Sequence, residues 1–265
     1  MSPEKEQLVI AAFNAGQTCR HITKTLGIGR NAASATLRKY GLTPRTGRPP
    51  SCTLDHEAFN SLTPTSMYWM GFLFADGSVA TGGGAPQLIL DIGTKDRGHI
   101  EAFRTFLKSD HAISDVTHKA STYGDITVRE RKSVAFRVRS QPLIDALGRQ
   151  GLVAGKKQRI PSATLARSPD FWRGCVDGDG TVGIYPDKCG YLYPVLKLCG
   201  QLKLIQVFQS FLRQHNISMN ITKTSSGIFQ IQMMGSLAKK MIAVLYHGNL
   251  TIALERKLTI VKSIF

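Results

Sequence analysis

The sequence predicts an α+β chain in which one αββαββα unit occurs twice in succession, after a small all-α domain. The first observation is a repeated motif: residues 69–77 read WMGFLFADG and residues 172–180 read WRGCVDGDG. The second is that the same order of expected strands and helices follows each motif. The third is the helical periodicity of residues 1–43. We therefore expect repeats over residues 66–168 and 169–265.

The charge of the chain points to a polyanionic partner. Of 265 residues, 34 are Lys or Arg and 18 are Asp or Glu, which gives a net charge of +16 and a pI near 9.9. Nucleic acid is the polyanion that such a balance most commonly serves. A basic surface kept for solubility is the alternative.

Neither a signal peptide nor a membrane span is expected. Met1–Gln7 is polar and acidic, and no stretch approaches the ~18 apolar residues of a span. The five cysteines are scattered without CxxC spacing, so we expect reduced thiols rather than disulfides or zinc ligands. These features predict a cytoplasmic protein with no membrane partner.

Residues 1–43 are expected to form three short helices. Apolar residues recur at helical spacing from Leu8, Gly16 ends the first helix, and Thr18 caps a second that Gly27 closes. A third follows over Arg30–Tyr40. The stretch FNAGQTCRHITKTLGIGRNAASATLRKYGL resembles the helix-turn-helix DNA-binding modules of resolvases and invertases. The residues predicted to contact DNA are Arg30, Asn31, Ser34 and Arg38. A three-helix packing module is the alternative.

Residues 44–65 are assigned to a basic, Pro- and Gly-rich linker. Its segment PRTGRPPS is kept extended by prolines and carries Arg45 and Arg48. Gly-Arg-Pro segments resemble the arms that place an arginine in the minor groove of DNA. A plain linker between domains would have the same composition, so both interpretations stay open.

The two motifs predict a close pair of helices. Small residues stand four apart in each: Gly71 and Ala75, then Gly174 and Gly178. Residues at this spacing share one helix face and let two backbones approach closely. Gly77 and Gly180 are expected to end the helices in the left-handed conformation. This packing would bring Asp76 and Asp179, at the two C-terminal ends, near one another.

Such a pair of carboxylates predicts a divalent metal site. A carboxylate at a helix C-terminus opposes the helix dipole by ~0.3–1 kcal/mol, and two neighbouring carboxylates repel each other. A bound cation removes both penalties. Two helix ends that happen to carry aspartate are the alternative, which leaves a doubled energetic cost unexplained.

Both motifs resemble the LAGLIDADG motif of homing endonucleases, over roughly Ser66–Phe265. The resemblance implies a monomer that is an internal pseudo-dimer, with two antiparallel sheets forming a saddle over double-stranded DNA. It implies that Asp76 and Asp179 hold Mg²⁺, for which Mn²⁺ can substitute, at the scissile phosphates. Hydrolysis by water would invert at phosphorus and cut both strands across the minor groove, leaving short 3′ overhangs. The motif's earlier acidic position is Asp177 in the second copy but Phe74 in the first, which leaves activity possible.

Alternation along the expected strands separates an apolar face from a polar face. Arg, Asn, Gln and Thr side chains are suited to reading base edges in a major groove. The residues predicted to contact DNA in this way are Thr127, Arg129, Arg131, Arg137, Arg139, Lys197, Asn220, Thr222, Gln230 and Gln232. A solvated antiparallel sheet also has a polar face. Four arginines on one hairpin face repel each other without a polyanion, which favours the DNA interpretation.

The family also places a lysine near the end of each repeat, where a cation stabilises the transition state of phosphodiester cleavage. Lys157 in KKQRIP resembles one, and Lys156 could take its place; Lys257 in LERKLTI resembles the other.

Two alternatives to a site-specific endonuclease stay open. One is a non-catalytic DNA-binding transcriptional regulator on the same scaffold, against which the presence of both Asp76 and Asp179 argues. The other is an RNA-binding intron maturase, which the expected duplex-reading helix-turn-helix disfavours. Salt dependence and a preference for duplex DNA over structured RNA would separate them.

Overall fold

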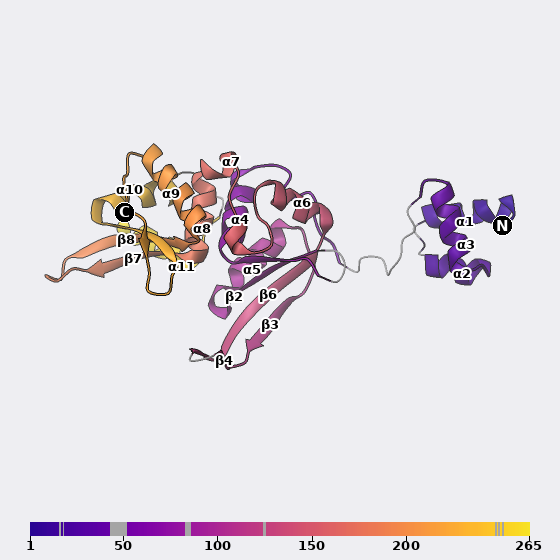
Figure 1. The fold of residues 1–265 in the computed structure, drawn as a ribbon, viewed down its shortest axis with the longest axis horizontal. Helices are drawn as coiled ribbons and strands as arrows, with labels where there is room; N and C mark the ends of the chain where they lie inside the picture. The colour runs from indigo at the N-terminus through magenta and orange to yellow at the C-terminus, as the bar shows by residue number, and fades with distance from the viewer. Residues whose placement is uncertain are drawn as a thin grey trace. The chain divides into compact units, whose positions relative to one another are not determined.

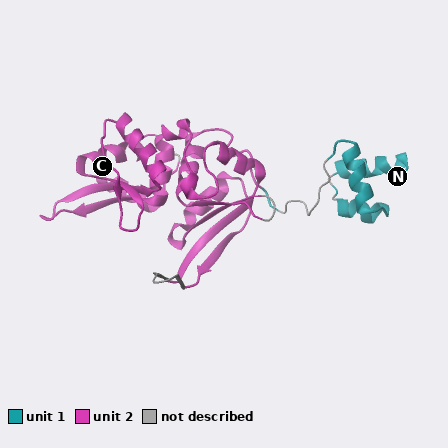
Figure 2. Cartoon of the chain, in the orientation of Figure 1, with its two compact units in different colours: residues 1–53 teal, residues 54–265 magenta. Residues whose placement is uncertain are grey.

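The computed structural model describes all residues except 16, 18, 43–51, 83–85, 124, 125, 247, 249 and 251, and it excludes the side chains of 121–128. Gly16, Thr18, Arg45, Arg48 and the side chain of Thr127 therefore lie outside the described residues. The chain forms two compact units, Met1–Thr53 and Leu54–Phe265 (Figure 2), and each is treated by itself. Among the described residues, no helix is both long enough and apolar enough to span a membrane.

The first unit consists of α1 (Pro3–Asn14), α2 (Cys19–Leu26) and α3 (Arg30–Lys39). Ser2 begins α1 by accepting a hydrogen bond from the amide of Lys5. Gly27, with φ of +62°, turns the chain directly after α2. The three helices enclose a small apolar core of Val9, Phe13, Cys19, Ile22 and Leu37. The three predicted helices are thus present, joined between α2 and α3 by a short glycine turn.

The second unit contains the two predicted repeats (Figure 1). Repeat 1 has the elements α4 (Pro64–Ala75), β1 (Gly77–Ala80), β2 (Gln87–Gly93), α5 (Arg97–Phe106), β3 (Ile113–His118), β4 (Ser121–Tyr123), β5 (Ile126–Val128), β6 (Arg131–Arg139) and α6 (Gln141–Arg149). Its main sheet is antiparallel with the order β1-β2-β6-β3, and β4 pairs with β5 in a small ribbon.

Repeat 2 has the elements α8 (Pro169–Asp179), β7 (Gly180–Pro186), β8 (Leu192–Gly200), α9 (Leu202–Gln214), β9 (Thr222–Lys223), β10 (Phe229–Met234) and α10 (Gly235–Tyr246). The order of its antiparallel sheet, β7-β8-β10-β9, is that of the first sheet. The short helix α7 (Ala163–Ala166) precedes this repeat and α11 (Glu255–Ile264) follows it. The predicted α+β architecture of two equivalent repeats is confirmed.

The motif helices α4 and α8 pack directly against each other at the junction of the repeats (Figure 1). Thr63 and Ser66 form a capping box at the start of α4, and Ser168 caps α8. Trp69 and Trp172 are fully buried at equivalent places, against Phe103 and Phe208 respectively. One continuous hydrophobic core joins both repeats. The burial of both helices positions their C-terminal ends against one another.

The second unit begins at Leu54, inside the segment that was expected to be a linker. Phe59 is buried and packs against Phe106, while Leu54 and Leu62 contact the same core. Residues 54–65 therefore belong to the folded unit instead of the linker predicted over 44–65. The prediction failed because loop-like composition does not reveal a single apolar anchor such as Phe59.

Two further expectations need correction. Of the segment 217–223, which carries the predicted contact residues Asn220 and Thr222, only β9 is a strand, although the alternation holds because Ile217 is buried and Ser218 exposed. Gly77 and Gly180 are not left-handed, and Gly180 has φ of −102°. A side chain at Gly180 would collide with the carbonyl oxygen of Val176 and one at Gly77 with that of Leu73. Glycine is required here for close approach rather than for φ.

Candidate active site

Three glycines allow the close approach of α4 and α8. A methyl group at Gly71 would collide with the carbonyl oxygen of Phe171, and one at Gly174 would collide with that of Tyr68. A methyl group at Gly178 would collide with the side chain of Ala75 and would stand 3.1 Å from Asp76 Oδ2. The small-residue interface predicted from the i, i+4 spacing is present, and it carries Asp76 to within reach of α8.

Asp76 and Asp179 lie at the C-terminal ends of these helices. Asp76 is the C-cap of α4 and Asp179 is the last residue of α8. Burial, together with the negative charge of Asp179, raises the pKa of Asp76 to about 6. Burial also raises the pKa of Asp179, while the ammonium group of Lys156 opposes that rise. Two partly desolvated carboxylates therefore influence each other at the junction of the repeats.

The basic group nearest to Asp179 is Lys156 instead of the predicted Lys157. Lys156 Nζ lies 3.6 Å from Asp179 Oδ2, and both side chains are partly exposed. Both lysines belong to the short 3-10 helix η2 (Lys156–Gln158), which points them in different directions. Within the described chain, Lys157 makes no ion pair or hydrogen bond. The alternative position named from the sequence is thus the one beside the carboxylate.

Lys257 is buried in a helix cap. Its Nζ donates hydrogen bonds to carbonyl oxygens at the end of α8, at distances of 2.5 Å to Val176, 2.8 Å to Asp177 and 2.7 Å to Gly180. Burial lowers its pKa to about 8, although the carboxylate of Asp177 opposes this. An ammonium group with three carbonyl acceptors satisfies the unpaired end of the helix.

Arg159 has the same arrangement in repeat 1. Its guanidinium donates to carbonyl oxygens at the end of α4, at 3.1 Å to Leu73, 2.9 Å to Phe74 and 3.0 Å to Gly77. Each carbonyl capped by Lys257 lies 103 positions after its counterpart capped by Arg159. The repeat pattern does not predict this role, because arginine and lysine are different residue types but are equivalent as cationic donors to a helix end.

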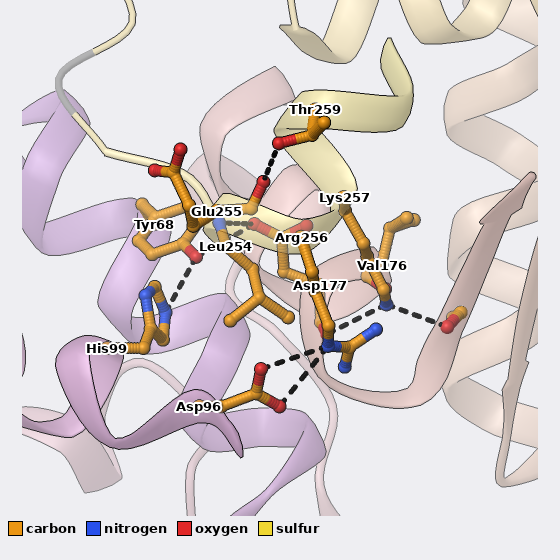
Figure 3. Close-up of polar contacts among 11 residues, drawn as sticks. Tyr68, Asp96, His99, Val176, Asp177, Leu254, Glu255, Arg256, Lys257 and Thr259 are labelled. Atoms are coloured by element: carbon orange, nitrogen blue, oxygen red, sulfur yellow. Dashed lines mark hydrogen bonds and ion pairs between the residues drawn. The ribbon is translucent and has the colours of Figure 1, made fainter.

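Asp177 is the centre of a buried polar network that joins the two repeats (Figure 3). Its carboxylate accepts hydrogen bonds from the hydroxyls of Tyr68 at 2.8 Å and Tyr246 at 2.6 Å, and from the amide of Leu254 at 2.8 Å. Burial raises its pKa, and these donors oppose the rise. In repeat 1 the equivalent residue is Phe74, which packs edge-on against Phe171. The two repeats therefore differ at this motif position: Asp177 accepts hydrogen bonds, whereas Phe74 packs against an aromatic ring.

The same network continues into repeat 1. His99 Nε2 lies 2.9 Å from the hydroxyl oxygen of Tyr68, and burial lowers the pKa of His99 to about 4, so the imidazole is neutral at physiological pH. Arg256 Nε donates to both oxygens of Asp96, at 3.0 and 3.3 Å (Figure 3). These contacts hold the segment that carries Lys257 against α5.

A cleft of about 170 Å³ opens beside Asp179. Its walls come from the ends of α4, α8 and β8, from the segment between α6 and α7, from the start of α9, and from Ile228 before β10. The lining residues are Phe74, Lys156, Arg159, Asp179, Cys199, Gly200, Gln201, Leu204 and Ile228. The partly exposed ammonium group of Lys156 and the carboxylate of Asp179 thus line the same cleft.

The strand registers place most of the predicted DNA-contact residues on one face of each sheet. In sheet 1 the core side of β6 carries Val134, Phe136 and Val138, while the residues between them point to the opposite face. That opposite face includes Arg131, Arg137 and Arg139. In sheet 2 it includes Lys197, Thr222, Gln230 and Gln232, in which Lys197 pairs with Gln232 and Thr222 with Gln230. Arg129 and Asn220 are exposed just outside the strands.

Two groups of side chains on these faces were not predicted from the sequence. His118 Nε2 lies 3.4 Å from Asp91 Oδ2 and 2.9 Å from the hydroxyl of Ser133 on sheet 1. On sheet 2, Tyr185 stands opposite Tyr193. Strict attention to the alternation of β2, β7 and β8 would have found both groups.

In the first unit, the predicted recognition residues lie on α3. Arg30, Asn31 and Arg38 are exposed and Ser34 is half-buried. Lys39 forms an ion pair with Glu6 at 2.9 Å, which holds α1 against α3. The exposed surface of α3 therefore retains its predicted polar residues.

No known family matches the chain by sequence, and no characterised protein does. A structural match links it to the LAGLIDADG meganuclease I-AabMI bound to uncleaved DNA, with a TM-score of 0.52 over 77% of this chain and 90% of that chain at 14% identity. The chain has the LAGLIDADG homing-endonuclease fold. The LAGLIDADG homing endonuclease I-GzeII in complex with its DNA target gives 0.45, with 14% identity over 77% of this chain and 88% of that one. I-SmaMI bound to uncleaved DNA with calcium ions gives 0.43, with 13% identity over 70% and 81%. In this LAGLIDADG fold, Asp76 and Asp179 stand at the ends of the two motif helices.

Proposed function

We propose that the protein is a site-specific endonuclease of the homing type, which cuts both strands of duplex DNA. The observation that carries the proposal is the pair Asp76 and Asp179 at equivalent helix ends, where burial raises both pKa values. Without a bound cation this arrangement destabilises the fold, because two partly buried carboxylates repel each other. The LAGLIDADG fold and the net charge of +16 support a DNA substrate.

The chemistry of the two carboxylates fits a divalent cation. Carboxylate oxygens are the ligands that Mg²⁺ and Mn²⁺ prefer in proteins. Within the described residues, Asp76 has no ion pair or side-chain hydrogen bond, and Asp179 has only Lys156 at 3.6 Å. Asp76 and Asp179 would therefore hold Mg²⁺, for which Mn²⁺ could substitute. The cation would neutralise the carboxylates and the charge that develops on the phosphodiester.

The other basic groups divide into two roles. Lys156 is exposed beside Asp179, so its ammonium group can also reach a phosphate oxygen and stabilise negative charge there. Lys257 and Arg159 are committed to helix carbonyls, and they position the two aspartates. Water attack would invert at phosphorus, and cutting the two strands across the minor groove would leave short 3′ overhangs.

The sheet faces would hold the duplex. These faces carry side chains of the kinds that read base edges and contact phosphates. They are Arg137, Arg139, Lys197, Gln230 and Gln232. The helices of the first unit would add a helix-turn-helix contact through Arg30, Asn31, Ser34 and Arg38, which lengthens the recognised site. The linker residues Arg45 and Arg48 would contribute a minor-groove arm.

The test is cleavage of a randomised duplex library in Mg²⁺, with sequencing of the broken ends. Wild-type protein is expected to produce defined double-strand breaks with short 3′ overhangs, and Asp179→Asn is expected to produce none. Asp145→Asn, which removes an exposed carboxylate on α6, is the matched control and should cut like wild type. Tight duplex binding without cleavage in Mg²⁺ or Mn²⁺ would reject the endonuclease and favour a DNA-binding regulator. Preference for structured RNA would favour a maturase.

A further inference from the structure

The β7–β8 hairpin carries a group of exposed aromatic and apolar side chains that the proposed function has not used. Tyr191 is 75% exposed, Leu192 71% and Tyr185 46%. The hairpin projects from the rest of the second unit (Figure 1). Exposed apolar groups that gather in one place commonly mark a contact surface.

The strand register places the tyrosines on the polar face of sheet 2. Tyr185 pairs with Tyr193, and Thr181 pairs with Lys197 farther along the same two strands. Residues two apart in a strand share a face, so both tyrosines lie on the face of Lys197. The opposite face is core, where Val182 and Leu196 are buried. The tyrosines therefore continue the face proposed to contact DNA.

The tip of the hairpin is fixed by hydrogen bonds. Asp187 Oδ1 accepts from the amides of Cys189 at 2.8 Å and Tyr191 at 2.9 Å, and the amide of Asp187 donates to the carbonyl of Tyr191 at 2.9 Å. Gly190, with φ of +86°, supplies the left-handed residue of this turn. Tyr191 is thus presented by an ordered turn, and the carboxylate of Asp187 is engaged within it.

The ring of Tyr185 lies over Gly183 on the same strand. A methyl group at Gly183 would stand 2.5 Å from Tyr185 Cε2 and 3.0 Å from its hydroxyl oxygen. The absence of a side chain at Gly183 therefore lets the ring lie along the sheet. Within the described chain, the hydroxyls of Tyr185, Tyr191 and Tyr193 make no hydrogen bond, so all three can bond to a ligand.

From these observations we infer that Tyr185, Tyr191 and Tyr193 bind the outer base pairs of the half-site under repeat 2, where they favour thymine by apolar contact with its methyl group. The inference rests on the proposed function. Aromatic rings pack against thymine methyls and deoxyribose, and phenol hydroxyls donate to phosphate oxygens. Lys188, exposed in the turn, balances the negative charge of the neighbouring Asp187. The positive charge of Lys197 on this face and the net charge of +16 favour duplex DNA over an apolar protein partner.

The spacing along the strand indicates which base pairs of the half-site should show the thymine preference. Tyr193 precedes Lys197 by four residues along β8, which corresponds to about 13 Å in a strand. At roughly 3.4 Å per base pair, the tyrosines would act about four base pairs outward from the position that Lys197 contacts. The corresponding hairpin of repeat 1 reads TGGGAP over residues 81–86 and has no aromatic residue. The preference should therefore occur in one half-site only.

The experiment is selection of binding sites from a randomised duplex library with the full chain in EDTA, so that no strand is cut. Wild-type protein is expected to enrich thymine at the outer positions of one half-site. The variant Tyr185→Ser/Tyr191→Ser/Tyr193→Ser should lose this enrichment and bind the selected site about tenfold more weakly. Gly183→Ala, which displaces the ring of Tyr185, should weaken it in part. Lys197→Ala should instead change the preference about four base pairs inward.

Leu237→Ser, which removes an exposed apolar side chain from α10, is the matched control and should select the wild-type site. Unchanged thymine enrichment and affinity in the triple variant would overturn this inference and leave the proposed function intact. Self-association of wild-type protein that the triple variant abolishes would assign the hairpin to a protein contact and also overturn it. Absence of duplex binding by wild-type protein would overturn the proposed function together with this inference.

Discussion

Arg159 and Lys257 occupy equivalent places in the two repeats, and each donates three hydrogen bonds to the carbonyl oxygens that end its motif helix. Each side chain is 3% exposed, so neither is a surface charge. A buried cation at a helix C-terminus stabilises the partial negative charge of the unpaired carbonyls. The two residues therefore fix the ends from which Asp76 and Asp179 project.

Substitution of Lys257 should cost stability. Lys257→Met removes the ammonium donor from three carbonyl oxygens and removes the positive charge near Asp177, so the free energy of unfolding should fall by about 2–4 kcal/mol. The melting temperature should fall by roughly 5–15 °C, measured by circular dichroism. Lys262→Met, an exposed lysine on the same helix, should change it little. Equal melting temperatures for both variants would contradict the capping role.

The repeat spacing predicted the two aspartates, but it could not predict these caps. The motif positions lie 103 residues apart, whereas Arg159 and Lys257 lie 98 apart, because the segments that lead to them differ in length. Sequence likeness to a lysine-bearing pattern therefore favoured Lys157, and the equivalent residue is an arginine two positions later. Only the folded arrangement shows which cation meets which carbonyl.

Glycines mark a second limit of sequence reasoning. The i, i+4 glycines of the motif predicted helix contact correctly, since small residues at that spacing have one main use. A glycine at the end of a helix can serve positive φ or close approach, and the prediction of positive φ for Gly77 and Gly180 is wrong. Likewise, the apolar anchor Phe59 was hidden in a segment of loop-like composition. A local sequence pattern can show that a position requires a particular residue type, but only the tertiary contacts show why it does.

Lys156 and Lys157 should differ in their effect on cleavage. Lys156→Met removes the ammonium group 3.6 Å from Asp179, so the cleavage rate in saturating Mg²⁺ should fall by about 10- to 100-fold. The neighbouring Lys157→Met changes the same residue type on the same short helix, and it should leave the rate within about twofold of wild type. Both variants should melt like wild type, because both lysines are exposed. A larger loss of cleavage rate in Lys157→Met than in Lys156→Met would show that Lys157 is the lysine that assists cleavage.

Asp76→Asn should stabilise the metal-free protein at neutral pH. Folding raises the pKa of Asp76 from about 3.8 to about 6, so ionisation of this carboxyl opposes folding. The penalty is absent below pH 3.8, grows as pH rises through the interval and is complete above pH 6. At pH 7.5 the free energy of unfolding should therefore rise by up to about 3 kcal/mol on substitution, and at pH 4 by little.

Urea unfolding in EDTA at the two pH values measures this difference. Addition of Mg²⁺ should stabilise wild-type protein and leave Asp76→Asn unchanged, because the variant lacks one ligand. Asp145→Asn provides the comparison for an exposed carboxylate and should behave like wild type at both pH values. A less stable Asp76→Asn protein at pH 7.5 would mean that the carboxylate has a stabilising partner in the fold.

Gly71→Ala should separate the two motif helices. The added methyl group would collide with the carbonyl oxygen of Phe171, which is backbone of α8 and cannot rotate away. The helices must then move apart, with an expected loss of at least about 3 kcal/mol in the free energy of unfolding. Gly148→Ala is the control, because a methyl group there meets no atom within 4 Å and should stabilise α6 by up to about 1 kcal/mol. Urea unfolding of both proteins measures the contrast, and a Gly71→Ala protein as stable as wild type would show that α4 and α8 do not need this contact.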